Sequence, residues 1–237
     1  MKHTSLLFVC LFAGTAASDA ALVFADDFSY ADGTTLSGQT PDVGSGTWAG
    51  GGGWKVNGGA VSLVGGSDSV YGYFTSALAA GQTLTLAFDT QAATGFLGSS
   101  WAVVSLYDHP GNELCYIGDP GGPTTYWTAG GSIVNASTSD NNQANTATLK
   151  YVFDTGAWTF STHGGSYNGT GTPGCAIDHL RIASGGTSDT PAGNMKLDGI
   201  TVSIAPDSLT AVPEPGSLLA LAGLLGSGVC LRIRRRK

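Results

Sequence analysis

The chain of 237 residues contains 37 glycines and only 27 charged residues, 10 basic and 17 acidic, and its formal net charge is −7. So few charges do not fit a charge-driven disordered chain, and the acidic balance excludes a nucleic acid as partner. Between residues 21 and 212, four basic residues stand against fifteen acidic ones, so we do not expect a polyanionic partner there.

The N-terminus predicts a secretory signal peptide over residues 1–20. A basic start, MKH, precedes an apolar run at 6–13, and small residues follow up to Ala20. The apolar run is too short to cross a bilayer. We therefore expect cleavage after Ala20, or alternatively after Ala17, and export of the remaining chain.

Residues 21–206 predict a single all-β domain, an antiparallel β-sandwich. Leu84, Leu86 and Phe88 alternate with threonines, and segment 200–204 repeats this alternation, as strands with one buried face do. Short strands separated by Gly, Asn, Asp and Pro favour antiparallel sheets, because parallel strands need long crossovers that this chain lacks. The predicted strands lie at 60–64, 69–77, 82–88, 101–107, 147–153, 157–162 and 200–204. Trp48 and Trp54 are expected to pin the glycine-rich loop 44–54.

Both ends of this domain resemble a known family. The opening ADDFSYADGTTLSGQT, at 25–40, and the closing AIDHLRIASGG and GNMKLDGITVSI, at 176–186 and 193–204, are similar to the terminal strands of exported bacterial domains with a concanavalin-like or laminin-G-like jelly roll. The resemblance implies that the first and last strands share one sheet, so that Asp26 and Asp27 could meet Asp198. The family includes lectins, laminin-type modules and glycoside hydrolases, so the fold alone does not select a function.

The C-terminus predicts a membrane-associated segment after a linker at 207–211. Residues 215–231 are uncharged and, as a helix rising about 1.5 Å per residue, would reach about 25 Å, the short limit for a membrane span. The basic cluster RIRRRK that follows would stay on the cytoplasmic side. These features predict an exported domain that ends in an anchor.

The sequence VPEPGSLLALAGLLGSGVCLRIRRRK, at 212–237, resembles the PEP-CTERM sorting signal of Gram-negative bacteria. The resemblance implies that Pro213, Glu214 and Pro215 form the recognition motif and that a membrane protease of the exosortase type processes the chain. It also implies an inner-membrane intermediate and a final place at the cell surface or outside the cell, often in organisms that make exopolysaccharide. The alternative is an ordinary tail anchor. The basic tail consists of Arg232, Arg234, Arg235, Arg236 and Lys237.

Cys115 and Cys175 are the cysteines of the exported domain, because Cys10 leaves with the signal peptide and Cys230 lies in the apolar tail. In an oxidising compartment two cysteines predict one disulfide bond. Two buried free thiols are the alternative. Neither cysteine has a Cys or His at zinc spacing, so we do not expect a zinc site.

Calcium is the candidate cofactor, because related sandwiches often carry a structural calcium ion near the terminal strands. This hard cation takes oxygen ligands from carboxylates and loop carbonyls. Asp27 and Asp198 are the candidate ligands, with Asp26 third. The alternative is that these aspartates initiate turns or face solvent. No other cofactor is expected.

The predicted domain lacks the familiar catalytic motifs. The glucanase branch of the jelly-roll family uses an ExDxxE strand, but residues 21–212 contain a single glutamate, Glu113, which we expect to project from a strand into solvent. His109, His163 and His179 stand alone in the sequence, and no GxSxG or HExxH motif occurs. We therefore predict that the domain is not an enzyme.

Aromatic residues of the central chain are candidates for a sugar-binding surface, because exposed rings can stack on sugars. Tyr126 and Trp127 follow the turn sequence DPGGP and are the first candidates, since neighbouring strand residues point in opposite directions and one ring should be exposed. The alternative is that they fill the core. The other candidates are Trp101, Tyr107, Tyr116 and Trp158.

The leading hypothesis is a non-catalytic component of the envelope or extracellular matrix, structural or carbohydrate-binding, with exopolysaccharide as the candidate partner. Two alternatives stay open. One is a polysaccharide-degrading hydrolase or lyase with a non-standard carboxylate pair, and the other is an adhesive module that binds another protein. Reducing-end release would identify the enzyme, and specific protein capture without glycan binding would identify the adhesive module.

Overall fold

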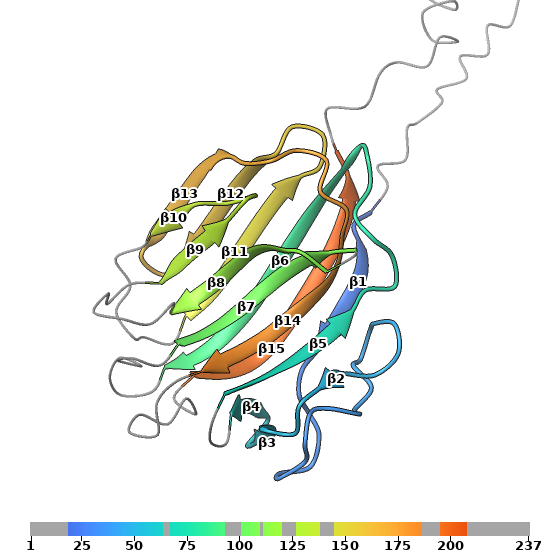
Figure 1. The fold of residues 1–237 in the computed structure, drawn as a ribbon, viewed down its shortest axis with the longest axis vertical. Helices are drawn as coiled ribbons and strands as arrows, with labels where there is room; N and C mark the ends of the chain where they lie inside the picture. Colours follow the sequence, from blue (N-terminus) through green and yellow to red (C-terminus); the bar gives the residue numbers. More distant parts are fainter. Residues whose placement is uncertain are drawn as a thin grey trace, which may run out of the picture.

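The computed structural model describes residues 19–63, 67–92, 101–109, 111–119, 127–137, 145–185 and 195–207. These residues form two antiparallel sheets that pack face to face, so the predicted all-β sandwich is confirmed (Figure 1). Within these ranges, no helix has the length and apolar character needed to span a bilayer. Residues 1–18 of the predicted signal peptide, and the sorting segment at 212–237, lie outside the described residues.

One sheet has eight strands. In spatial order it comprises β13 (Gly165–Thr170), β12 (Ala157–Thr162), β11 (Asn145–Val152), β6 (Gln82–Ala92), β15 (Met195–Pro206), β4 (Ala60–Leu63) and β3 (Trp54–Asn57), with β1 (Ala21–Asp26) also paired to β15. Strands β6 and β15 carry the two alternating patterns of the sequence. Leu86 of β6 lies opposite both Leu149 of β11 and Val202 of β15, and all three are buried. The apolar residues of the alternation therefore face inward, as predicted.

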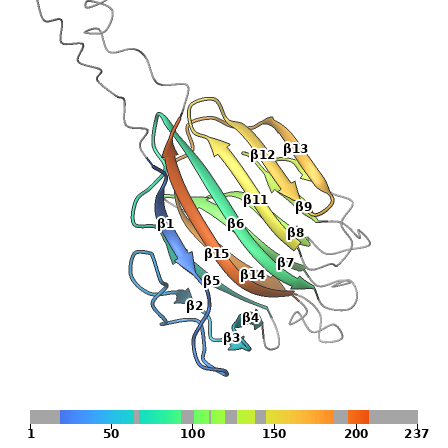
Figure 2. The ribbon, with the colours of Figure 1, turned by 180° about the vertical axis from the view of Figure 1, so that it is seen from behind.

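The other sheet has seven strands. In spatial order it comprises β10 (Ala136–Ser137), β9 (Thr128–Gly131), β8 (Glu113–Asp119), β7 (Trp101–Asp108), β14 (Ile177–Gly185), β5 (Asp68–Tyr73) and β2 (Ala49–Gly50). This sheet lies in front in Figure 1, and Figure 2 shows the eight-stranded sheet from the opposite side. Because β14 pairs with β7, and β7 with β8, residues far apart in the sequence meet on the outer face of this sheet.

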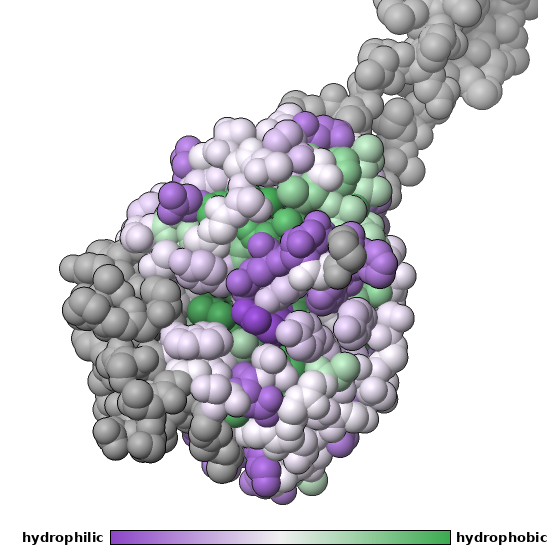
Figure 3. Space-filling view, in the orientation of Figure 1, coloured by the Kyte–Doolittle hydropathy of each residue, from purple (hydrophilic) through white to green (hydrophobic). Residues whose placement is uncertain are grey.

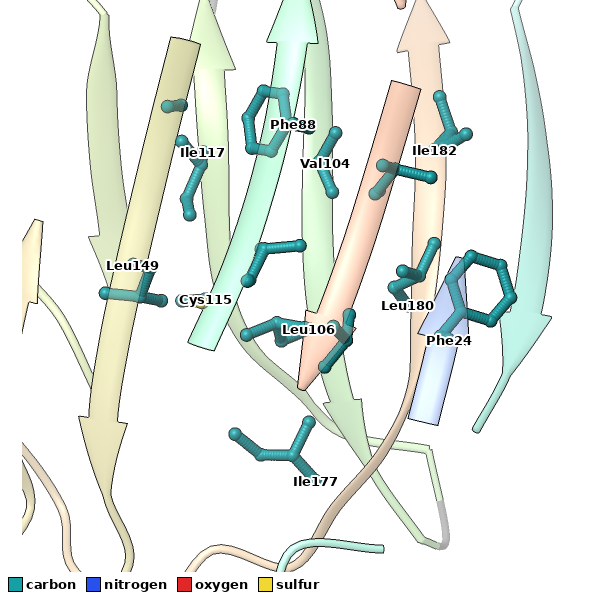
Figure 4. Packing of buried hydrophobic residues seen from close by; sticks show 14 of the residues in the cluster. Phe24, Phe88, Val104, Leu106, Cys115, Ile117, Leu149, Ile177, Leu180 and Ile182 are labelled. Atoms are coloured by element: carbon teal, nitrogen blue, oxygen red, sulfur yellow. The ribbon is translucent and has the colours of Figure 1, made fainter. Parts of the chain in front are cut away.

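The core lies between the two sheets. Figure 4 shows apolar side chains from both sheets directed into one layer, among them Phe88 and Leu149 from the first sheet and Val104, Leu106 and Ile182 from the second. Full burial of one such side chain stabilises the fold by about 1.5–3 kcal/mol. All members of this buried cluster fall between positions 23 and 204. Segment 21–206 therefore carries a complete core, and we expect it to fold by itself.

The first and last strands lie side by side in the eight-stranded sheet. Ala21 lies opposite Ile204, and Asp26 lies opposite Ile200, in an antiparallel register. This arrangement is the one that the resemblance to the jelly-roll family implies. In both views of the ribbon, the start of β1 and the end of β15 lie at the same end of the sandwich (Figures 1 and 2).

The glycine-rich segment 44–54 is held by two tryptophans, as its sequence predicts. Trp48 and Trp54 are both fully buried. Trp48 meets Phe24 edge-on, with ring centroids 5.2 Å apart, and its Nε1 donates a hydrogen bond to Asp26. This anchor brings segment 27–47 back over the end of β1, where Asp42 comes to lie beside the aspartates of that strand end.

Candidate functional site

A pocket of about 420 Å³ lies on the outer face of the seven-stranded sheet. The described residues that line it come from β7, β8 and β14 and are Trp101, Val103, Glu113, Tyr116 and Arg181. The strand register brings them together, because Ser105 of β7 lies opposite both Arg181 and Tyr116. Figure 3 shows this side of the molecule, where hydrophilic residues gather over the centre beside patches of hydrophobic residues. We call it the outer-face pocket.

Two aromatic rings of the outer-face pocket lie over glycines of the neighbouring strands. Trp101 is directly opposite Gly185 of β14, and Tyr116 is directly opposite Gly130 of β9. A side-chain carbon on Gly185 would come within 2.7 Å of the indole nitrogen, and one on Gly130 within 2.5 Å of the phenol oxygen. The absent side chains therefore make room for both rings to lie against the sheet. Both residues remain partly exposed, so they offer apolar surface to the pocket.

A close ion pair joins the two charged residues of the pocket. Nη2 of Arg181 donates to Oε1 of Glu113 at 2.6 Å and to Oγ of Ser105 at 3.4 Å. The guanidinium carbon lies 5.1 Å from the centroid of the Tyr107 ring, which is a cation–π geometry. The side chain of Arg181 is 20% exposed and that of Glu113 is 36% exposed, so a ligand can reach the pair. Glu113 does project from a strand, as predicted, but it neutralises Arg181 rather than standing alone in solvent.

The hydrogen-bond donors of Arg181 are only partly used. A guanidinium group carries five N–H donors. Among the described residues, Nη1 finds no acceptor, and Nε is buried without one. Within the described part of the chain, the protein thus leaves the two N–H groups of Nη1 unused, and the side chain that carries them is 20% exposed.

A stack of aromatic rings continues the outer face toward β5. His179 lies between Tyr73 and Tyr107, with ring centroids 5.1 and 5.2 Å away. Nδ1 of His179 lies 2.5 Å from Oδ1 of Asp178. Burial raises the pKa of Tyr107 to about 12, whereas Tyr73 is 41% exposed. Tyr107 is thus a buried support of the outer face, and His179, although it is on that face, is covered by its two neighbours.

A second pocket, of about 210 Å³, lies where β1 ends beside β15 and β6. Oxygen atoms of Asp26, Asp27 and Asp42 lie there within 4.8 Å of one another. We call these residues the acidic cluster. Asp27 is a predicted calcium ligand, but Asp198, the other one, is exposed at a bulge of β15 and is not a member of the cluster. Asp42 is the third member of the cluster, because the hydrogen bond from Trp48 to Asp26 anchors the segment 27–47 that carries Asp42.

Asp26 is the buried member of the acidic cluster and is held by several donors. Its Oδ1 accepts a hydrogen bond from the backbone N–H of Phe28 at 2.7 Å. Its Oδ2 accepts from Nε1 of Trp48 at 2.6 Å and from the hydroxyl of Tyr30 at 2.7 Å. Burial raises the pKa of the Asp26 carboxyl, although these three hydrogen bonds act in the opposite direction.

The predicted disulfide bond is not formed, because Cys115 and Cys175 are both free thiols. Cys115 points from β8 into the core between the sheets (Figure 4), and burial raises the pKa of its thiol to about 12. Cys175 lies just before β14, where its Sγ is 3.6 Å from the carbonyl oxygen of Thr172. The orientation of β8 thus places the Cys115 sulfur in the core. Both thiols are free, but only Cys115 is buried, so the alternative of two buried free thiols holds for Cys115 alone.

One of the two first candidates for a sugar-binding ring, Trp127, is part of the core. Trp127 is 6% exposed and stacks on Phe88 of the opposite sheet, with ring centroids 6.1 Å apart. This burial corrects the expectation for Trp127, while its neighbour Tyr126 lies outside the described residues. Trp101 and Tyr116, which the sequence named only among several candidates, are the rings that the strand register places in the outer-face pocket.

Residues 211–236 match the family model of the PEP-CTERM protein-sorting motif. The chain therefore carries this motif at its C-terminal end, as its sequence predicts, and is an exported protein. No curated protein matches the chain.

The sandwich is similar to several solved carbohydrate-recognition structures. The CBM2 module of the evolved Dit of Lactobacillus casei BL23 phage J-1 is 13% identical with a TM-score of 0.53, over 79% of this chain and 97% of that one. The carbohydrate recognition domain of Emp47p is 8% identical with a TM-score of 0.55, over 81% and 99%. The exoplasmic/lumenal domain of VIP36, in a Ca²⁺/Man₂-bound form, is 11% identical with a TM-score of 0.51, over 76% and 89%. These similarities show that the sandwich has a concanavalin-like jelly-roll fold.

Proposed function

We propose that this exported protein is a non-catalytic, carbohydrate-binding component of the cell surface or extracellular matrix, and that the outer-face pocket binds polysaccharide. The observation that carries the proposal is the pair of rings, Trp101 and Tyr116, that lie against the sheet over glycines. Rings held in this way present apolar surface on which sugar rings can stack, and a few polar groups beside them fix the orientation of a ligand. Arg181 and Glu113 supply those polar groups.

The composition of the pocket supports binding rather than hydrolysis. Retaining and inverting glycosidases place two carboxyl groups about 5–9.5 Å apart across the scissile bond. Of the described residues that line the outer-face pocket, Glu113 alone is acidic, and it is paired with Arg181. The described lining of this pocket therefore lacks the second carboxyl group that such a mechanism needs.

The sorting motif supports a place for this pocket at the cell surface. An exosortase-type protease is the proposed processing partner, with Pro213, Glu214 and Pro215 as its recognition residues, and a matrix exopolysaccharide is the proposed ligand. Before processing, the apolar segment would hold the chain in the inner membrane of a Gram-negative bacterium. The proposed division of the chain is a signal peptide at 1–20, the sandwich at 21–206, a linker at 207–211 and the sorting segment at 212–237.

Calcium is the proposed structural ion of the acidic cluster. Ca²⁺ prefers oxygen ligands, and the carboxylates of Asp27 and Asp42 are exposed beside each other. Asp26 fits less well, because its two oxygens already accept hydrogen bonds from three protein groups. The ion would therefore be held by Asp27 and Asp42, and it would relieve the repulsion between carboxylates at the end of β1.

The proposed function is tested by the binding of segment 21–206 to a panel of soluble and insoluble polysaccharides. We expect at least one polysaccharide to bind, and we expect Trp101→Ala and Tyr116→Ala to weaken that binding at least tenfold. Tyr167→Ala is the matched control, because this partly buried ring lies on β13 of the other sheet. Cooperative urea unfolding of each variant shows that it is folded.

The same experiment separates the alternatives. Release of reducing ends by the purified segment would replace the proposal with the hydrolase. Failure of every polysaccharide, together with specific capture of one protein partner, would replace it with the adhesive module. Equal loss of binding in Tyr167→Ala and Trp101→Ala would remove the outer-face pocket as the site.

A further inference from the structure

We propose that the outer-face pocket selects uncharged polysaccharides, and that the Arg181–Glu113 pair makes this selection. The inference rests on the proposed function and names the ligand chemistry of the same site. It follows from the charge of the pocket, from the hydrogen-bond groups that the pair exposes, and from the surface that the rings provide.

The ion pair cancels the charge of the pocket. Nη2 of Arg181 and Oε1 of Glu113 are 2.6 Å apart, and no other described residue that lines the pocket is charged. An anionic sugar that approached Arg181 would have to displace the Glu113 carboxylate or lie beside it. Like charges so close together repel strongly, and the acidic domain around the pocket adds to this repulsion. An uncharged ligand neither has to displace the Glu113 carboxylate nor is repelled by the acidic domain.

The pair also presents a donor and an acceptor next to each other. Nη1 of Arg181 keeps its N–H groups unused among the described residues, and the Glu113 carboxylate is partly exposed and can accept further hydrogen bonds. A sugar hydroxyl can accept a hydrogen bond and donate one. Two neighbouring hydroxyls can therefore accept from Arg181 and donate to Glu113 without disturbing the ion pair. A sugar carboxylate can only accept, so it offers Glu113 no hydrogen bond of its own.

The rings complete this selection. Trp101 on β7 and Tyr116 on β8 offer apolar surface beside the charged pair. A neutral sugar ring places its C–H groups against such a surface and its hydroxyls at the edge. The pocket therefore suits a neutral, hydroxyl-rich chain rather than a uronic acid or sulfated one.

The test uses pairs of polysaccharides that share a backbone and differ in charge. Methyl-esterified and de-esterified polygalacturonate form one pair, and hydroxyethyl and carboxymethyl cellulose form another. Dissociation constants are measured for segment 21–206, and for the full-length chain in detergent, at about 20 and 200 mM salt. We expect the wild type to bind the uncharged member at least tenfold more tightly, with little dependence on salt.

Glu113→Gln is the decisive variant, because it leaves Arg181 with an unneutralised charge. We expect this variant to bind the uncharged member more weakly and the carboxylated member more tightly, with binding to the latter falling as salt increases. Asp32→Asn removes one negative charge elsewhere on the domain and keeps an oxygen that can accept the hydrogen bond from Gly58. This control should leave the preference of the wild type unchanged.

The results separate this inference from the function on which it rests. A wild type that prefers the carboxylated member, or a Glu113→Gln variant with an unchanged preference, would overturn the inference while carbohydrate binding stands. Equal shifts in Asp32→Asn and Glu113→Gln would also overturn it, because overall charge would then explain the preference. If a folded wild type binds no polysaccharide of either kind, both proposals fall.

Discussion

The ring of Tyr116 on β8 lies over Gly130, its direct neighbour on β9, so closely that any side chain at Gly130 would meet the phenol oxygen. Glycine weakens a strand, because it has no side chain to pack and loses more backbone entropy than other residues. At Gly130, however, the missing side chain leaves space in which the Tyr116 ring lies against the sheet. The same relationship joins Trp101 and Gly185.

Gly130→Ala should therefore reduce polysaccharide binding by lifting the Tyr116 ring away from the sheet. The new methyl group collides with the far end of a side chain that can rotate, so we expect a change in the unfolding free energy of about 1 kcal/mol or less. Loss of the stacking contact should weaken binding about 3- to 10-fold. Affinity electrophoresis and urea unfolding measure the two effects. Ser137→Ala on β10 is the control, and binding unaffected by Gly130→Ala would show that the ring position is irrelevant.

The two thiols of the folded sandwich should react at different rates. Because the pKa of Cys115 is raised to about 12 by burial, this thiol stays protonated at pH 8, and the thiolate is the reactive form. Cys175 is only partly buried. Iodoacetamide should therefore modify Cys175 alone in folded segment 21–206 and both cysteines in urea, as mass spectrometry can show. A protein oxidised in air that lacks any free thiol would contradict the structure.

The stability of the fold should depend on the ionisation of Asp26. In the unfolded chain this carboxyl has a pKa near 3.8, and burial raises its pKa in the folded protein. The folded state therefore binds the proton of Asp26 more tightly than the unfolded state does. This tighter proton binding adds to the unfolding free energy below about pH 3.8, and the added stability is lost as pH rises through the folded pKa. Asp26→Asn removes this titration.

Urea unfolding of the wild type and of Asp26→Asn between about pH 3.5 and 7 measures this effect. We expect the wild type to lose more unfolding free energy than the variant over this range, even though the variant is less stable overall because it disturbs the donors from Trp48 and Tyr30. If the unfolding free energies of the two proteins changed in parallel with pH, Asp26 would have the same pKa in the folded and the unfolded state.

Calcium should stabilise the sandwich through Asp27 and Asp42. A ligand that binds only the folded state adds about 2.7 kcal/mol at 100 times its dissociation constant. We expect calcium to raise the Tm of the wild type, EDTA to reverse the rise, and Asp42→Asn to abolish it. Asp32→Asn, outside the acidic cluster, should respond like the wild type. A Tm that is insensitive to both calcium and EDTA would remove the ion from the proposal.

Strands β6 and β15 of the eight-stranded sheet were predictable, because the alternation of apolar and polar residues is present in their own sequences. Leu84, Leu86 and Phe88 alternate with polar residues, and a strand with that alternation buries one face wherever it pairs. The shorter strands were harder to recognise. β9 consists of Thr, Ala and two glycines, and β13 of small polar residues with one tyrosine, so neither shows an apolar alternation.

The candidate site could not be assembled from the sequence, because it depends on which strands become neighbours. Arg181 and Glu113 are separated by 68 positions in the chain, and only the pairing of β14, β7 and β8 brings them into contact. The glycines below the rings give a partial signal, but a glycine in a strand equally suggests a bulge or a turn. Asp42 was missed for a similar reason, since only the burial of Trp48 returns its loop to β1.

The pairing of β1 with β15 also governs when the domain can fold during export. β1 pairs with β15, so in the export route that we propose the sheet stays open until residue 206 has been translocated. Contacts between such distant segments form slowly. The sorting motif begins at residue 211, only a few positions after β15 ends. Closure of the sheet and recognition of the motif therefore involve the same short stretch of chain. In the proposed route, the processing protease meets a folded domain only if the chain pauses in the membrane long enough for β1 to pair with β15.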